Sequence, residues 1–170
     1  MRDAPLDWPQ ALRRYLAASV LLHLGWEILQ LPLYTIWVQP IGKQAFAVLH
    51  CTIGDAMIAG LSLLIALALF GLPAWPRDGA RPVWIAVVTL GIGYTLYSEW
   101  LNVNVRGTWT YSELMPKIPI IGTGIAPLLQ WVIVSTIALR IASGAVPTSG
   151  GGPVARRTET TVNSSTIGDV

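Results

Sequence analysis

The stretch from Tyr15 to Trp37 (YLAASVLLHLGWEILQLPLYTIW) is long and apolar enough to cross a lipid bilayer, which takes about 20 residues. It nevertheless contains two ionisable residues, His23 and Glu27. At about 3.6 residues per turn, the polar residues of this stretch share one stripe of a helix, namely Ser19, His23, Glu27, Gln30 and Tyr34. Because an ionisable group in hydrocarbon costs several kcal/mol, this stripe is expected to face protein or water. The stretch therefore predicts a membrane helix with a polar face.

The composition of the whole chain agrees with an integral membrane protein. Of its 170 residues, 53% are hydrophobic and only 12% are charged, against about 25% charged in a typical soluble domain. The lipid bilayer is therefore the first partner that the sequence predicts. A net charge of +2 with scattered basic residues argues against nucleic acid as a partner. The single cysteine, Cys51, permits no internal disulfide.

Four apolar runs with short connections predict an all-α protein with one domain, a four-transmembrane-helix bundle over residues 1–142. The helices are expected at about 15–37, 45–72, 83–101 and 120–141. We expect Pro32 to bend the first helix without ending it before Trp37. Residues 143–170 are rich in Gly, Ser, Thr and Pro, and this composition predicts a disordered C-terminal tail.

The distribution of basic residues predicts the orientation. Eight of the eleven lysines and arginines fall on the side of the two termini and the 73–82 loop, and three fall on the other side. The positive-inside rule therefore predicts that both termini lie in the cytoplasm. The polar segments HLGWE, HCTIGD, SEW and PLLQW resemble those of small bacterial inner-membrane proteins, and we expect that location. Tryptophans near the predicted helix ends, such as Trp75 and Trp100, are expected at the membrane interfaces.

The three later helices repeat the pattern of one polar stripe each. The stripes comprise Cys51, Asp55 and Ser62 on the second helix, Thr95, Glu99 and Asn102 on the third, and Thr123, Pro127 and Gln130 on the fourth. With a rise of about 1.5 Å per residue, Glu27 and Asp55 fall at the same depth, and Glu99 lies nearer the outer end. The pattern predicts a bundle around a polar interior that opens away from the cytoplasm.

These stripes supply the candidate site residues. The ligand-binding candidates are Glu27, Gln30, Asp55, Glu99, Asn102 and Tyr111, the last from an aromatic connection that is either a lid or an interfacial belt. The catalytic candidates are His23, Glu27 and Glu99, and the metal-ligand candidates are His23, Glu27 and Asp55. No established metal motif accompanies them, and structural polar pairing remains the alternative for each residue. The sequence does not identify a cofactor.

Three functions fit this sequence. The first is to bind or move a small ligand, a proton or a metal through Glu27, Asp55 and Glu99. The second is acid–base catalysis on a lipid-soluble substrate, with His23 and Glu27 as the proton-handling pair and Glu99 as their counterpart. The third is a non-catalytic assembly or accessory role, in which the polar stripes pack against a protein partner or a second copy of the chain. The sequence does not decide whether the protein is an enzyme.

The placement of the ionisable residues on the helices is similar to that in a known family. A histidine and a glutamate on the first of four helices, with a carboxylate on the third, resemble the arrangement of intramembrane sterol isomerases. The resemblance implies the acid–base function, but it is one of layout and rests on no shared motif, so no residue roles follow from it.

Overall fold

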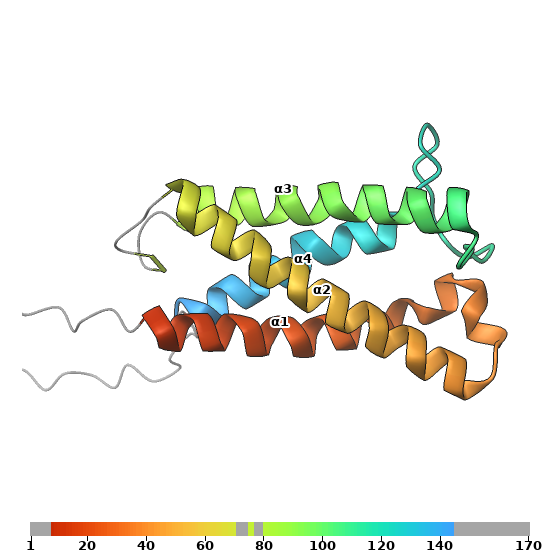
Figure 1. The fold of residues 1–170 in the computed structure, drawn as a ribbon, viewed down its shortest axis with the longest axis horizontal. Coiled ribbons are helices and arrows are strands. Elements are labelled where there is room, and N and C mark those ends of the chain that lie inside the picture. The colour runs from red at the N-terminus through yellow and green to blue at the C-terminus, as the bar shows by residue number, and fades with distance from the viewer. Residues whose placement is uncertain (1–7, 71–74, 77–79, 145–170) are drawn as a thin grey trace, which may run out of the picture.

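The computed structural model describes residues 8–70, 75–76 and 80–144. The described part is all-α, and its four long helices are α1 (Trp8–Gln30), α2 (Ile41–Phe70), α3 (Ala80–Glu99) and α4 (Ile125–Ala142). They lie side by side as a bundle, in which α1 and α3 run in one direction and α2 and α4 in the other (Figure 1). The predicted all-α bundle is therefore confirmed for the described residues.

Three of these helices are long and apolar enough to cross a membrane: α1 with the turn after it (Trp8–Leu33), α2 and α4. One face of α2 exposes large apolar side chains at helical spacing, namely Phe46, Leu49, Ile53, Met57, Leu61 and Leu64. An apolar surface of this extent is typical of a face that contacts lipid. The fold is thus that of a multi-pass membrane protein. The α3 helix, which has Arg81 near its start and Glu99 at its end, is not among the three.

The α1 helix differs at both ends from the helix predicted over 15–37. It begins at Trp8, so the first turns include residues that were expected to precede it. It ends at Gln30 and is followed by two 3₁₀ turns, Leu31–Leu33 and Thr35–Val38. The prediction of a bent helix continuing to Trp37 is therefore wrong. Pro32 has no N–H to continue the α-helical hydrogen bonding, so the chain tightens into 3₁₀ turns instead.

The α2 and α3 helices are extended relative to their predicted ranges. The α2 helix begins at Ile41 rather than near 45, because the carbonyl of Pro40 accepts hydrogen bonds from the first amides of the helix. The α3 helix begins at Ala80 and continues into a π-helix, Trp100–Arg106, that ends at Gly107 with a φ of 61°. The first residues of the predicted connection 102–119 are therefore helical.

The α4 helix starts later than predicted, at Ile125 instead of about 120. Gly122, with a φ of 70°, makes a turn in which its amide donates to the carbonyl of Ile118 at 2.8 Å, and this conformation is incompatible with a helix. At the other end of α4, Ser143 and Gly144 complete the last turn. The remainder of the predicted disordered tail lies outside the described residues.

The two halves of the bundle have different interiors. We call the half in which α1 begins and α4 ends the packed half, because an apolar core fills it. This core contains Ala11, Tyr15, Ala18, Ala59, Leu63, Ala66, Trp75, Val83, Val87, Trp131, Ala138 and Ala142. Trp75, predicted to lie at an interface, is only 4% exposed and belongs to this core. We call the other half, in which α1 and α3 end, the cavity half.

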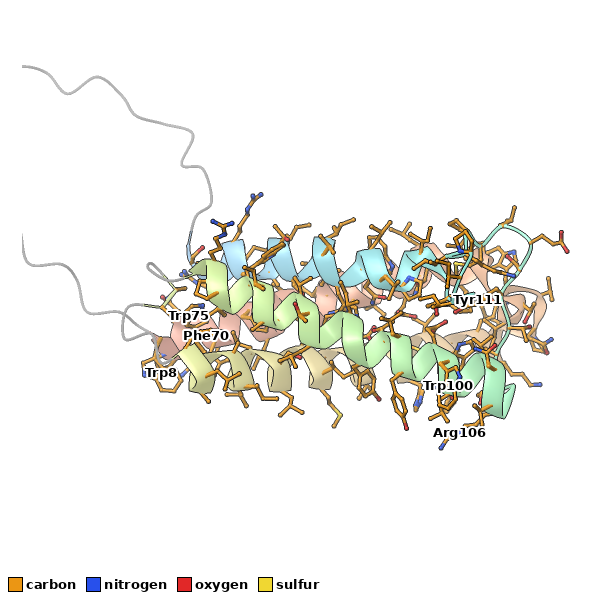
Figure 2. All side chains as sticks on the ribbon, turned by 90° about the horizontal axis from the view of Figure 1, so that it is seen from above. Trp8, Phe70, Trp75, Trp100, Arg106 and Tyr111 are labelled. Carbon is orange, nitrogen blue, oxygen red and sulfur yellow. The ribbon has the colours of Figure 1, made fainter. Side chains whose placement is uncertain are left out.

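Aromatic side chains mark the two ends of the bundle. Figure 2 shows Trp8, Phe70 and Trp75 at the end of the packed half, and Trp100 and Tyr111 at the end of the cavity half. Trp8 and Phe70 are exposed at one end and Trp100 at the other. This placement is typical of residues at the two interfaces of a membrane.

One close approach fixes how α3 and α4 pack. A Cβ atom built on Gly91 of α3 would lie 2.1 Å from Cε3 of Trp131, on α4. Only glycine therefore lets the indole lie against the α3 backbone. The Trp131 Nε1 atom donates a hydrogen bond to Thr95 Oγ1 at 2.6 Å, which fixes the orientation of the indole ring. Trp131 forms the boundary between the packed half and the cavity half.

Candidate functional site

The cavity half contains a partly open space of about 510 Å³, within the size range of small-molecule sites. Residues from all four helices, from the π-helix and from the connection after it line this cavity. The polar and charged residues that line it include Glu27, Gln30, Asp55, Ser98, Glu99, Asn102 and Gln130. Five of the six predicted ligand-binding residues therefore lie around one space, and Tyr111 contacts one of them.

Gln130 of α4 connects the side chains at the inner end of the cavity. Its Nε2 atom lies 2.7 Å from His23 Nδ1, 3.2 Å from Glu27 Oε1 and 2.8 Å from Asp55 Oδ2. An amide nitrogen carries two hydrogens, so it donates to at most two of these three neighbours at once. The contacts of Gln130 also confirm that Glu27 and Asp55 lie at the same depth.

His23 lies behind this cluster and is fully buried. Its Nδ1 atom is 3.5 Å from Asp55 Oδ2, and its ring packs against Trp131 with the centroids 5.2 Å apart. Its Nε2 atom has no hydrogen-bond partner among the described residues. The structure thus pairs His23 with Asp55 and Gln130 rather than with Glu27, and His23 is not one of the residues that line the cavity.

Glu27 is held in place from its own helix as well. Its Oε1 atom accepts a hydrogen bond from Gln30 Nε2 at 2.7 Å, and Gln30 Oε1 in turn accepts one from Trp26 Nε1 at 3.1 Å. The spacing of three and four residues puts these side chains on adjacent turns of α1. This chain of contacts orients the Glu27 carboxylate toward Gln130 and the cavity.

Glu99 forms a second polar group, nearer the end of the bundle. Its carboxylate is 6% exposed and accepts hydrogen bonds from the hydroxyls of Tyr34 (3.5 Å) and Tyr111. Lys117 Nζ lies 5.5 Å from the centroid of the Tyr111 ring, in a cation–π contact. Burial, and then the contact with the Glu99 carboxylate, raise the pKa of Tyr111 above its ordinary value. Tyr111 is therefore a neutral hydrogen-bond donor near pH 7.

The connection that carries Tyr111 is tied to the turn after α1. The amide of Thr35 donates to the carbonyl of Thr110, and the amide of Ser112 donates to the carbonyl of Leu33, both at 2.9 Å. These bonds flank a short antiparallel bridge between Tyr34 and Tyr111. The aromatic connection, predicted to be a lid or a belt, is thus hydrogen-bonded to the turn after α1 at the end of the cavity half. We call the bridged residues 33–35 and 108–112 the cap.

Gln130 is a site residue that the sequence pattern did not predict as a ligand-binding residue. The sequence places it on the polar stripe of the fourth helix and indicates no further role. A signal was available, because Gln130 is the only amide side chain in α4 and lies within a run of apolar residues. Asn102, which was selected, lines the cavity and donates to the Ser98 carbonyl at 2.9 Å.

The predicted metal ligands do not form a ready metal site. Among the described residues, no group of three or more His, Cys, Asp or Glu side chains is placed to hold a metal ion. The side-chain nitrogen of Gln130 occupies the position between His23, Glu27 and Asp55, and an amide N–H group is a donor rather than a ligand. Cys51, the free thiol, also lines the cavity.

No protein family model matches this chain, and no curated protein or solved structure matches it either. What the geometry provides is a helical membrane bundle with buried polar contacts between His23 and Asp55 and around Glu99. The chemistry of the site follows from these contacts and from the cavity that they surround.

Proposed function

We propose that this protein is a four-span membrane protein whose cavity binds a small ligand carrying a positively charged amine. The observation that carries this proposal is that Glu27, Asp55 and Glu99, from three different helices, line one cavity. Among the described residues that line it, Arg106 is the only lysine or arginine. Carboxylates that have no lysine or arginine partner in a largely apolar cavity favour a cation supplied by the ligand.

The aromatic lining supports the same class of ligand. Phe46, Tyr94, Tyr97 and Trp109 all line the cavity. The faces of aromatic rings attract ammonium groups, and the contact of a lysine with a tyrosine in the cap is a local example. Apolar and aromatic walls with a few polar groups at one end are typical of a site for a molecule with an apolar body and a charged head.

The packed half supports binding from one side rather than passage through the bundle. Beyond Gln130 the interior contains Trp131, which is 1% exposed, and Leu63, which is fully buried. A path for ions or polar solutes needs polar groups or water along its length. The predicted orientation would make this cavity open away from the cytoplasm, with α3 as the fourth crossing.

The proposal is tested with n-butylamine, which is small, soluble and cationic. Purified protein in phosphatidylcholine nanodiscs is titrated with it, and unfolding is followed by tryptophan fluorescence. A ligand present at about 100 times its Kd stabilises the folded state by about 2.7 kcal/mol. We expect butylamine to raise the unfolding temperature and n-butanol and butyrate, which have the same chain with a neutral or anionic head, to raise it much less.

Matched variants identify the groups responsible. Asp55→Asn and Glu99→Gln keep size and hydrogen bonding but remove one negative charge each, so we expect them to lose most of the stabilisation by butylamine. Glu113→Gln is the control, because Glu113 is an exposed acid near the cap that does not line the cavity. Equal responses of the Glu99 and Glu113 variants, or equal stabilisation by butanol and butylamine, would refute an amine site.

A further inference from the structure

We infer that the ligand is a single-chain amphiphile that enters from the bilayer between α2 and α3, with its amine in the cavity and its alkyl chain between the two helices. This inference rests on the proposed function, because the amine head is the part that the carboxylates bind. It adds the source of the ligand, its chemical class and its route into the site.

A second hollow lies next to the cavity, between α2 and α3. It is lined by His50, Ile53, Gly54, Met57, Ile58 and Tyr94. Four of these residues, His50, Gly54, Ile58 and Tyr94, also line the main cavity. The two spaces therefore meet along α2, and the acid-lined cavity continues sideways into a mainly apolar hollow.

The outer side of this hollow lies on the surface expected to contact lipid. Ile53 is 61% exposed and Met57 is 70% exposed, and both belong to the apolar stripe of α2. Tyr94, across the hollow on α3, is 49% exposed. An opening bordered by such side chains gives access to an apolar molecule in the bilayer more readily than to a solute in water.

The paths of the two helices create the opening. In the packed half, α2 and α3 share the apolar core, with Leu63 on one helix and Val83 and Val87 on the other. Toward the cavity half, α2 crosses away from α3 and approaches the end of α1 (Figure 1). Gly54 lies where the two hollows meet, and a Cβ atom built on it would have no heavy atom within 4 Å. The space beside Gly54 is thus open.

Because the two spaces are continuous, the molecule that fills them must fit both the acid-lined cavity and the apolar hollow. A membrane-spanning helix of a partner would cover the hollow, but its backbone is too wide to follow the hollow into the carboxylate cluster. An alkyl chain with an amine head satisfies both regions at once, because its head fits the acid-lined cavity and its chain fits the side chains of Ile53, Met57 and Ile58. Met57 is flexible and adapts to chains of different shape.

The inference is tested with dodecylamine that carries a photoreactive diazirine in the middle of its chain. The probe is added to the protein in phosphatidylcholine nanodiscs, and the crosslinked residues are identified by mass spectrometry. We expect labelling on α2 around Ile53 and Met57 and on α3 around Tyr94. Excess butylamine is expected to reduce this labelling, because both molecules place an amine in the same cavity.

A matched pair of glycine variants tests the route. Gly54→Leu fills the space where the hollows meet, and we expect labelling of α2 and α3 to fall about tenfold, which is the lower end of the effect of extra methylenes in an apolar pocket. Gly93→Leu is the control, because Gly93 is exposed on α3, lines neither hollow and has open space at its Cβ position. Leucine also favours the helix over glycine at both positions.

The outcomes separate this inference from the proposed function. Labelling of the cap, or equal labelling in the Gly54 and Gly93 variants, overturns lateral entry and leaves the binding of butylamine intact. If butylamine has no effect while labelling still depends on Gly54, the hollow between α2 and α3 accepts the alkyl chain without binding of the amine in the cavity. That result overturns the proposed function and supports only the route.

Discussion

Replacing Gly91 by alanine is the most direct test of the packing that closes the inner end of the cavity. The new Cβ atom would lie 2.1 Å from Cε3 and 2.2 Å from Cδ2 of Trp131. Non-bonded carbon atoms pack at about 3.5–4.0 Å, so the indole would have to move by about 1.5 Å. It has little freedom to do so, since it is almost fully buried between Thr95 and His23.

The expected change in the free energy of unfolding follows from three contributions. Forcing an extra methyl group into a packed core costs about 1–3 kcal/mol. Displacing the indole also weakens the hydrogen bond from Trp131 to Thr95, at a cost of about 1 kcal/mol. Against these, alanine stabilises a helix relative to glycine by about 1 kcal/mol. We therefore expect Gly91→Ala to lower stability by about 1–3 kcal/mol.

The assay is reversible unfolding in mixed detergent micelles, followed by tryptophan fluorescence. Gly93→Ala is the control, because its Cβ meets no heavy atom within 4 Å, and it should gain up to about 1 kcal/mol from helix propensity alone. In a Trp131→Leu background, the cost of Gly91→Ala should shrink, because the two residues contact each other. If Gly91→Ala is as stable as Gly93→Ala, the close contact between α3 and α4 is refuted.

Two further predictions concern the polar groups. Gln130→Leu removes the amide that contacts His23, Glu27 and Asp55 and leaves their polar atoms without this partner, so we expect it to lower the free energy of unfolding by about 2–4 kcal/mol in the same assay. Unchanged stability would contradict the role of Gln130. Tyr111 has a raised pKa in the folded state, mainly through burial, so the unfolded chain loses this proton first as pH rises. The stabilisation from neutral Tyr111 is fully present below its ordinary pKa of 10.0. Above that pH, the free energy of unfolding of the wild type should fall relative to that of Tyr111→Phe. A constant difference between the two proteins from pH 8 to pH 11 would refute this.

The sequence by itself determined the features that depend on local geometry. Low charge and long apolar runs define a membrane protein, and helical periodicity places His23 and Glu27 on one face of α1. The fixed rise per residue also puts Glu27 and Asp55 at one depth, which the contacts of Gln130 confirm. Each of these properties follows from the geometry of one helix at a time in a bilayer of known thickness, so the packing between helices need not be known.

Helix ends were less predictable, because they depend on hydrogen bonds made by neighbouring turns. Pro32 was recognised as a disruption, but hydropathy did not reveal that the chain would change to 3₁₀ turns after Gln30. The amide of Ser112, far along the chain, bonds to the carbonyl of Leu33 and stabilises that change. A glycine turn at Gly122 similarly delayed the start of α4.

Only the tertiary structure decided which polar groups meet and which residues line the cavity. Each helix has one polar stripe, but the rotation and crossing of the helices determine that His23 contacts Asp55 and that Glu99 contacts two tyrosines. That crossing is fixed by side chains packed elsewhere, such as Trp131 against Gly91. Helix packing depends on the shapes of both surfaces at once, and a single sequence pattern describes only one surface at a time.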